Sequence, residues 1–402
     1  MPVEFIGAVL TNRASETHDA GPPVDRAYFR RIVRAHEDGD FDRALVALAS
    51  TIAEPMQVAA DAAAHSERLG FLVAHRPGFI APTVVARQYA TLDQFSQGRV
   101  ALHTISGGVD AEQRRDGDFL EKADRYARSE EFLRVLKRAW TSTEPFGHDG
   151  RFYRFEDFVL ATPPHQRPRI PIFFGGSSSV AFRIGATEAD THALFALPPA
   201  QLAAEIAKIR AAATAAGRDH GPRISVSFRP ILGATEELAW ARAERILETT
   251  KARIAAGGDL QTFRGRPAEG PSEGFRRQLE AAEQGPRHGK ALWTELAKAL
   301  GAGGNSTALV GTPETVAEAL LEYVDLGVST LLIRGYDPLD DAIDYGRELI
   351  PIVRQEVARR DRERAAAGRE LIGAAPVGGA GWREDAGLIP RSVEPAREAV
   401  AA

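Results

Sequence analysis

Residues 171–179 read PIFFGGSSS, and this short stretch is the best guide to the fold of the chain. Its bulky apolar residues are typical of a buried strand, and the Gly-Gly pair is typical of the turn that ends one. Three serines and a helix-like segment at 180–189 follow directly. Because glycine permits close approach to the backbone and a helix N-terminus presents unpaired N–H groups, this order predicts a cradle for an anion such as phosphate. The alternative is a glycine turn followed by a serine N-cap that binds nothing.

The same order of strand and helix repeats along most of the 402 residues. Short apolar runs alternate with longer amphipathic stretches, which predicts right-handed βαβ units and a parallel sheet. Eight such units favour an α/β fold, a (β/α)8 TIM barrel with insertion segments, whose active site lies at the C-terminal ends of the strands. The strands are expected at 3–10, 44–49, 71–75, 100–106, 172–174, 191–195, 224–232 and 330–333.

Two segments interrupt the alternation. Residues 140–171 are a long excursion, with a small hairpin expected around Asp149-Gly150. Residues 257–306 are rich in Gly, Pro, Arg and Glu, with one helical piece near 289–300, and we expect this insertion to form a lid. The barrel domain is therefore expected to span 1–364, and the Gly/Ala/Pro-rich residues 365–402 to form a C-terminal arm.

The composition narrows the class of protein. Hydrophobic residues make up 44% and charged residues 26%, which is ordinary for a soluble globular protein. The net charge of -5 offers no general attraction for nucleic acid, and no apolar run is long enough to span a membrane. Cysteine is absent and the histidines lack metal-ligand spacing, so neither thiolate chemistry nor a metal is expected. The N-terminus has no signal-peptide pattern, and we expect a cytoplasmic protein.

Several ordered segments carry a resemblance to a known family. They include AHRPGF at the start of residues 74–108, DRYARSEEF within 119–140, the cradle segment 171–181, IRGYDP within 306–342, and GLIPRSV at 387–393. These segments resemble the bacterial luciferase-like flavin monooxygenases, and they are most similar to the two-component alkanesulfonate monooxygenases. The family's (β/α)8 barrel with an insertion agrees with the alternation of elements.

The resemblance also implies the chemistry. Reduced FMN (FMNH2) would be supplied by a separate NAD(P)H:FMN reductase and would react with O2, and the flavin peroxide would oxygenate a small organic substrate. In the sulfonate enzymes the C–S bond is cleaved, which yields an aldehyde and sulfite. The family also implies a homodimer or homotetramer.

The predicted cradle suits the phosphate of FMN. Ser177 and Ser178, with the backbone N–H groups after Gly175 and Gly176, would surround it. Tyr126 resembles the family tyrosine that donates its hydroxyl to the same phosphate. The alternative for Tyr126 is a tyrosine that covers apolar side chains on a helix surface.

Other candidates lie after neighbouring strands. The resemblance places His103 and Ser106 against the flavin ring, although a strand histidine is also a common hydrogen-bonded core residue. His75 is a candidate catalytic residue and Arg76 a candidate substrate-binding residue. A cation at this position either holds substrate or pairs with a nearby carboxylate.

Two further candidates are catalytic by resemblance. Tyr336, in IRGYDP, matches a family active-site tyrosine whose hydroxyl stabilises an oxyanion or a peroxide. Arg229 matches a family arginine that attracts an anionic substrate, and its planar fork suits a sulfonate. The alternative for Arg229 is a salt bridge at the barrel mouth.

The chain also departs from the family pattern. Ile231 replaces a histidine, Phe195 begins Phe-Ala-Leu-Pro in place of Trp-Gly-Glu-Pro, and Ile52 stands near a family cysteine. The arginine before the loop glycines is missing from GAGGNSTALVG at 301–311. We expect Ile52, Phe195 and Ile231 to form an apolar substrate wall, which favours a less charged substrate such as a sulfone. Arginines of the predicted lid, at 264, 266, 276 and 277, are the alternative source of positive charge.

Two other functions remain open from the sequence. One is F420-dependent hydride transfer within the same superfamily, and the other is a non-catalytic barrel that only binds flavin. No P-loop motif and no dinucleotide G-x-G-x-x-G motif follows a strand, which argues against a tightly bound NAD.

Overall fold

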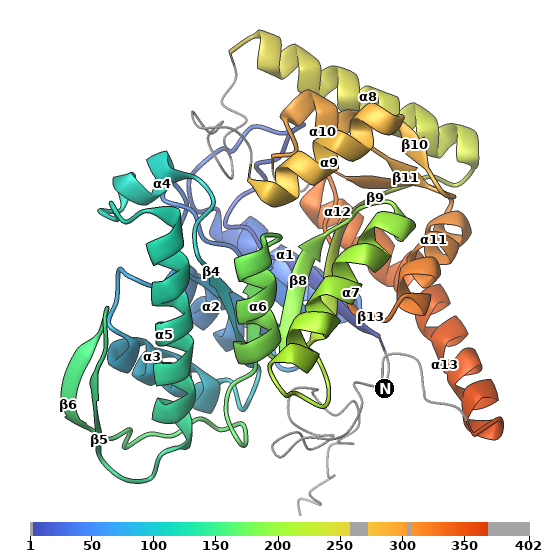
Figure 1. The fold of residues 1–402 in the computed structure, drawn as a ribbon. Coiled ribbons are helices and arrows are strands. Elements are labelled where there is room, and N and C mark those ends of the chain that lie inside the picture. The colour runs from blue at the N-terminus through green and yellow to red at the C-terminus, as the bar shows by residue number, and fades with distance from the viewer. Residues whose placement is uncertain (1–2, 258–271, 304–306, 369–402) are drawn as a thin grey trace, which may run out of the picture.

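The computed structural model describes residues 3–257, 272–303 and 307–368. Within these ranges, eight parallel strands pair side by side and close into a ring, with helices packed around it (Figure 1). The predicted (β/α)8 barrel is therefore confirmed. In order around the ring, the strands are β1 (Glu4–Ala8), β2 (Arg43–Val46), β3 (Gly70–His75), β4 (Val100–Ile105), β7 (Ile172–Gly175), β8 (Thr191–Phe195), β9 (Arg223–Leu232) and β13 (Val328–Ile333).

The helices begin where their sequences allow it. Asp25, Ser178 and Thr312 each accept a hydrogen bond from the backbone N–H three residues on, which satisfies a donor that the helix leaves unpaired. Proline stands in the first turn of six of the described helices, where its missing N–H costs nothing. The surrounding helices are α1 (Arg26–Asp38), α2 (Pro55–Ala64), α3 (Pro82–Phe95), α5 (Lys122–Thr141), α6 (Ser179–Glu188), α7 (Pro199–Ala215), α11 (Pro313–Asp325), α12 (Pro338–Asp344), the π-helical turn η1 (Tyr345–Leu349) and α13 (Ile350–Ala366).

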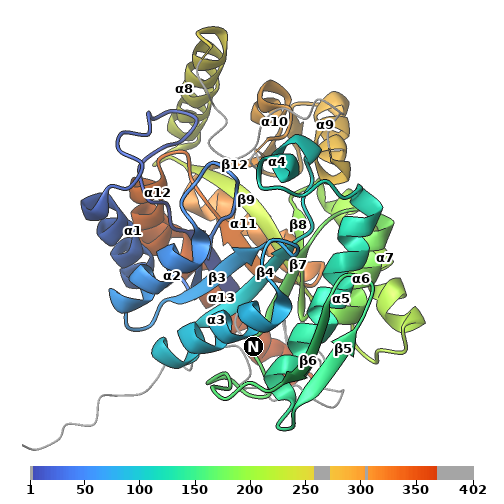
Figure 2. The same ribbon diagram turned by 90° about the vertical axis from the view of Figure 1, so that its left-hand side faces the viewer.

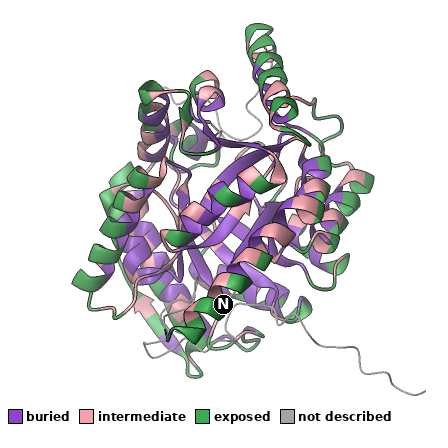
Figure 3. Ribbon diagram, turned by 90° about the vertical axis from the view of Figure 1, so that its right-hand side faces the viewer, coloured by how far each residue is buried: buried purple, intermediate pink, exposed green. Residues whose placement is uncertain are grey.

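Side-chain alternation along the strands divides the core into two layers. One face of each strand points into the ring, where Ile6, Leu72 and Phe173 pack together. The other face packs against the helices, as Phe5 and Phe71 do. Figure 3 shows the strands buried and the outer faces of the helices exposed. The direction in which a strand side chain points therefore depends on its parity in the sequence.

Strand β9 belongs to two sheets. Its first half pairs with β8 and β13 in the ring, and Arg229–Leu232 pairs with β12 (Ala308–Gly311) outside it. The short strands β11 (Leu292–Trp293) and β10 (Arg287–His288) extend this side sheet. Helices α8 (Glu236–Ala255) and α10 (Glu295–Leu300) cover it, as Figure 1 shows at the top of the molecule.

The described parts of the insertions contain more secondary structure than the sequence indicated. The predicted hairpin is present as β5 (Phe146–Asp149) and β6 (Arg154–Phe158), at one side of the barrel in Figure 2. The predicted lid region has a second helix, α9 (Glu273–Gln284), beyond the one expected near 289–300. A short helix, α4 (Asp110–Arg115), was not expected. Residues 258–271 and 304–306 of the predicted lid, and 369–402 of the predicted arm, lie outside the described residues.

Candidate active site

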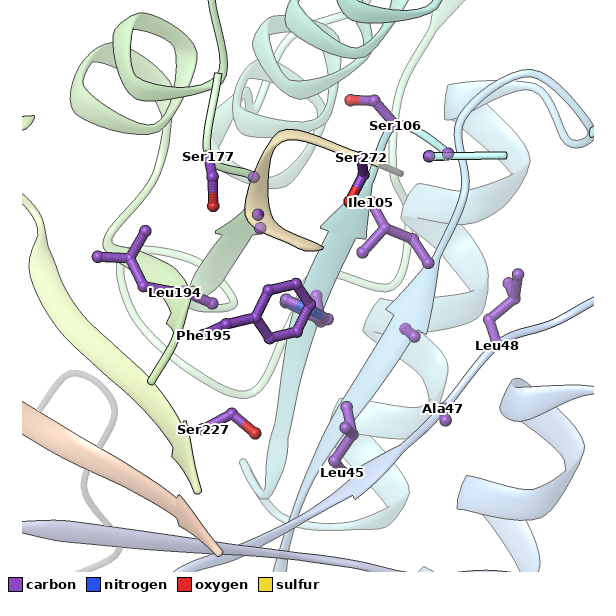
Figure 4. A pocket seen from close by; sticks show the side chains of 18 of the residues that line it. Leu45, Ala47, Leu48, Ile105, Ser106, Ser177, Leu194, Phe195, Ser227 and Ser272 are labelled. Atoms are coloured by element: carbon purple, nitrogen blue, oxygen red, sulfur yellow. The ribbon is translucent and has the colours of Figure 1, made fainter. Parts of the chain in front are cut away.

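A cavity of about 250 Å3 lies at the C-terminal ends of the barrel strands. Each of the eight ring strands, or the residues directly after it, contributes to its lining, and so do the starts of α5 and α9. Figure 4 shows the Phe195 ring projecting into this space, with Ser177 on one side and Ile105 and Leu48 across from it. This is the edge at which a TIM barrel places its chemistry, and the sequence predicted it there.

The most sharply constrained part of the cavity lies between β7 and α6. We call Gly175, Gly176, Ser177, Ser178 and Tyr126 the Gly-Ser cradle; all five line the cavity. A Cβ on Gly176, where φ is +156°, would lie 2.6 Å from the Cβ of Ala181, so the backbone has room here only for glycine. The cradle therefore presents the N-terminal end of α6 to the cavity, where an anion is favoured.

The cradle contains both features that the sequence suggested for the serines, a helix N-cap and a side chain that faces the cavity. The Ser178 Oγ caps α6 by accepting from the Ala181 N–H at 3.2 Å. Ser177, one residue earlier, lines the cavity as Ser178 does but does not cap the helix. The hydroxyl of Tyr126, on α5, forms a hydrogen bond with the Ser178 side chain, and burial raises the pKa of Tyr126. This hydroxyl is therefore protonated and able to donate. Lys122, one helical turn before Tyr126, is an exposed cation at the same edge and was not predicted from the sequence.

His103 and Ser106 lie beside the cradle at the end of β4. A Cβ on Gly175 would stand 3.3 Å from His103 Cε1, so the imidazole packs against that glycine. The Ser106 Oγ donates to the Ser129 Oγ at 2.9 Å, which ties the strand end to α5. Both residues line the cavity, and contact with the flavin ring stays a prediction.

Phe195 forms part of the cavity wall, as predicted, together with an element that the sequence did not reveal. Its ring lies 5.5 Å from that of Phe275, at the start of α9. A Cβ on Gly274 would come within 2.9 Å of the Phe195 ring. The first turn of α9 therefore closes over the Phe195 side of the cavity.

Arg229 lines the cavity but has its charge paired. Its two terminal nitrogens donate to the two carboxylate oxygens of Glu16 at 3.0 and 2.9 Å, and one also donates to the Gly335 carbonyl at 2.9 Å. Its guanidinium carbon stands 3.7 Å from the centroid of the Tyr336 ring. The salt bridge considered for Arg229 from the sequence is therefore present.

A second arginine, Arg334, shares Glu16 with Arg229 and also lines the cavity. Its guanidinium lies 3.9 Å from Glu16, and burial together with the charge of Arg229 lowers the pKa of Arg334 to about 10. Burial would raise the pKa of Glu16, but the arginine charges and the Arg229 hydrogen bond outweigh it and lower the pKa to about 2. Glu16 is therefore ionised, and the cluster of two arginines and one carboxylate carries one net positive charge. Neither Glu16 nor Arg334 was predicted from the sequence. Only the position of Arg334, directly after a strand, could have indicated it.

Arg76 lines the cavity through a buried ion pair. Its guanidinium donates to Glu112 at 2.9 Å and to Asp116 at 3.2 Å, both on or next to α4. The carboxylate pairing that the sequence left open for Arg76 is therefore realised. Because two carboxylates face one arginine, this side of the cavity does not favour an anionic group.

The structure places His75 and Ile52 outside the cavity lining. His75 has the parity of Phe71 and therefore points outward, where its ring stacks on Phe132 with centroids 5.1 Å apart. Burial lowers the pKa of His75 to about 3, so this histidine is neutral. Because β2 ends at Val46, before the expected 49, Ala47 and Leu48 line the cavity in place of Ile52.

Ile231 and Tyr336 also lie outside the cavity lining. Both are buried in a small core with Trp293 and Leu296, between the side sheet and its helices. Ile231 is there because β9 has left the ring by this point and pairs with β12. Tyr336 lies behind Arg229, as seen from the cavity, and supports that residue through its ring. The predicted apolar wall is thus built from Phe195, Leu48 and neighbouring residues.

The described structure is a TIM barrel whose strand ends join a glycine-rich helix N-terminus to a largely apolar cavity, the place where enzymes of this fold hold their active sites. The family model for luciferase-like monooxygenases matches residues 3–330, and the chain belongs to this family. It is accordingly an enzyme, an oxidoreductase.

Solved structures of similar fold include enzymes with different cofactors. Riboflavin lyase RcaE, whose structure contains a modified FMN and riboflavin, is 19% identical, with a TM-score of 0.71 over 89% of this chain and 92% of that one. EDTA monooxygenase EmoA from Chelativorans sp. BNC1 is also 19% identical, with a TM-score of 0.70 over 89% and 94%. An F420-dependent secondary alcohol dehydrogenase is 18% identical, with a TM-score of 0.63 over 88% and 100%. At these identities the likeness supports the fold.

No group of three His, Asp or Glu side chains in the ranges that the structure covers is placed to hold a metal ion. None of the helices described in the structure is both long and apolar enough to cross a membrane.

Proposed function

We propose that this protein is a monooxygenase that uses FMNH2 and O2 to oxygenate a small organic substrate. The observation that carries the proposal is the junction of the Gly-Ser cradle with an apolar cavity at the mouth of a luciferase-like barrel. The cradle is suited to a phosphate, because it combines a helix N-terminus, a glycine at a position where any Cβ would clash, and a protonated tyrosine hydroxyl. Reduced FMN, when bound, supplies two electrons, so that one oxygen atom of O2 enters the substrate and the other leaves as water.

The residues of the cradle would hold the cofactor. The first backbone N–H groups of α6 and the hydroxyls of Ser177 and Tyr126 would donate to the phosphate, and this would fix one end of the flavin. His103 and Ser106, on the neighbouring strand end, would position the ring. Lys122 adds a positive charge at the edge of the phosphate site.

The apolar residues of the cavity would keep water away from the reaction. Phe195, Phe275 and Leu48 come from three separate segments and line one continuous space. A dry cavity strengthens the polar contacts to the cofactor and limits side reactions with water. Oxygen-dependent chemistry on an organic substrate benefits from such surroundings.

The substrate class follows from how the arginines are paired. The fork of Arg229, which in a sulfonate enzyme would meet two sulfonate oxygens, is bound by Glu16 in this structure. Arg76 is likewise paired with Glu112. We therefore favour a neutral substrate, a sulfone or another neutral organic molecule. C–S cleavage of an alkanesulfonate to an aldehyde and sulfite is the second candidate, and the net positive charge that Arg334 adds near Arg229 is the observation in its favour.

A separate NAD(P)H:FMN reductase is the proposed source of FMNH2. The test is an anaerobic titration of the protein with FMN, FMNH2 and F420, followed by admission of air with a panel of sulfones and alkanesulfonates. Oxygenated products are identified by mass spectrometry, and sulfite is assayed directly. The control without substrate measures oxygen consumption by free FMNH2.

Each outcome decides between the candidates. Tight binding of FMNH2, together with oxygenation of a sulfone and no sulfite release, supports the monooxygenase of a neutral substrate. Sulfite release from a sulfonate supports the alkanesulfonate monooxygenase. Tight binding of F420 with hydride transfer in the absence of O2 would replace the monooxygenase with a deazaflavin enzyme. Flavin binding without any substrate oxidation across the panel would support a non-catalytic flavin-binding barrel.

A further inference from the structure

His192 lies directly behind the Gly-Ser cradle, on the outer face of β8, and is fully buried. Its Nε2 stands 2.8 Å from the carbonyl oxygen of Gly176. A carbonyl oxygen only accepts hydrogen bonds, so Nε2 carries the proton and donates it. Burial lowers the pKa of His192 to about 4, which leaves the ring neutral with this one donor.

The surroundings of His192 hold its ring in one orientation. A Cβ on Gly185, inside α6, would lie 1.9 Å from His192 Nδ1, so the helix admits the ring only because residue 185 is glycine. Glycine is otherwise unfavourable inside a helix. The rings of Phe174 and Phe182 flank the imidazole at 6.3 and 5.6 Å between centroids. The contact with Gly176 is therefore built by residues of β7, β8 and α6 together.

The hydrogen bond from His192 acts on the peptide that joins Gly176 to Ser177. A trans peptide is planar, and its C=O and N–H point in opposite directions. When His192 holds the Gly176 carbonyl on the outer side, the Ser177 N–H is turned the other way, toward the side on which Ser177 lines the cavity. Gly176 has no side chain that would otherwise restrain this peptide.

We propose that His192 is a positioning residue for the cofactor: its Nε2–H fixes the Gly176–Ser177 peptide so that the Ser177 N–H donates to the phosphate of FMN. The proposal rests on the proposed function, because it assumes that the cradle holds that phosphate. His192 itself touches neither the cavity nor the cofactor. Its effect is expected on the phosphate end of the flavin and not on the ring.

The test compares the affinity for FMN with that for riboflavin, which has the same ring and no phosphate. Both are bound anaerobically in reduced form to wild type, His192→Phe and His192→Gln, at a temperature where circular dichroism shows all variants folded. Phe keeps a ring between Phe174 and Phe182 without the donor, whereas Gln keeps an N–H at a similar reach. Tyr89→Phe is the matched control, because it removes a buried hydrogen bond to the carbonyl of Val73, away from the cradle.

We expect His192→Phe to lower the ratio of FMN affinity to riboflavin affinity by at least about tenfold, since a hydrogen bond to a charged group is lost. His192→Gln should restore most of the ratio, and Tyr89→Phe should leave it unchanged. An unchanged ratio in His192→Phe, or an equal fall in both His192 variants, would overturn the proposal. A wild type that binds FMN no more tightly than riboflavin would instead contradict the phosphate site, and with it the proposed function.

Discussion

Glu16 and Arg229, 213 residues apart in the sequence, form a two-pronged ion pair. Each carboxylate oxygen of Glu16 accepts a hydrogen bond from one terminal nitrogen of Arg229. Arg229 comes from the strand β9, and Glu16 from the segment that follows β1. The pair lies at the cavity edge and is nearly excluded from solvent, since the side chain of Arg229 is 1% exposed and that of Glu16 is 10% exposed. Glu16 therefore controls both the charge that the cavity presents and the stability of its rim.

Replacing Glu16 by Gln is expected to lower the free energy of unfolding by about 3 kcal/mol, because it leaves Arg229 buried without its counter-charge. Urea denaturation followed by circular dichroism measures the change. Glu356→Gln is the matched control, because Glu356 also binds two arginines but lies at the surface. Equal losses in the two variants would contradict the assigned importance of burial.

Acid is expected to destabilise the protein from about pH 6.5 downward. His36, His75 and His192 have pKa values lowered by burial to about 4, 3 and 4, so the unfolded chain takes up protons first as the pH falls. Each contributes a slope of up to about 1.4 kcal/mol per pH unit below the ordinary histidine pKa. Urea denaturation at a series of pH values measures the slope.

The matched variant in the acid series is His75→Phe, which can stack on Phe132 as the histidine does. This variant should reduce the slope of unfolding free energy against pH by the contribution of one histidine, up to about 1.4 kcal/mol per pH unit. A slope that is the same in this variant and in wild type would show that His75 is not kept neutral by burial.

Gly176→Ala is expected to weaken FMN binding by at least about tenfold, because the new methyl would press against Ala181 at the start of α6 and displace the cradle. Flavin fluorescence quenching measures the affinity. Gly217→Ala is the control, since Gly217 also has a positive φ, +72°, but open space around it. This control should lose some stability and keep its flavin affinity. Full FMN affinity in Gly176→Ala would place the phosphate elsewhere.

Tyr126→Phe is expected to reduce FMN affinity by about tenfold to a hundredfold and to leave riboflavin affinity unchanged, because the phosphate loses a donor and the flavin ring does not. The two affinities are measured under the same anaerobic conditions. Tyr153→Phe removes a buried hydroxyl that has no hydrogen-bond partner among the described residues, and it should affect neither affinity. A parallel loss of riboflavin binding in Tyr126→Phe would assign Tyr126 to packing of the helix and not to the phosphate.

The predicted elements that depend on local patterns agree with the structure. All eight ring strands and the hairpin at Asp149-Gly150 were predicted from apolar runs and turn residues. The helix α9 was missed because its apolar residues, such as Phe275, are sparse in a polar segment and pack only against distant parts of the chain. The side sheet was missed because β10 and β11 are two residues long; β10 is held only by pairing with β11, and β11 by pairing with β12.

The amino-acid sequence by itself determined the barrel and the segment 175–178 of the Gly-Ser cradle, since strand periodicity, glycines and a helix start all act within a few residues of one another. Tertiary structure alone decided which side chains reach the cavity. Strand parity turned His75 outward, the exit of β9 from the ring carried Ile231 away, and Glu16 met Arg229 only because the barrel closes. These outcomes depend on the register and closure of the sheet, which no local segment specifies.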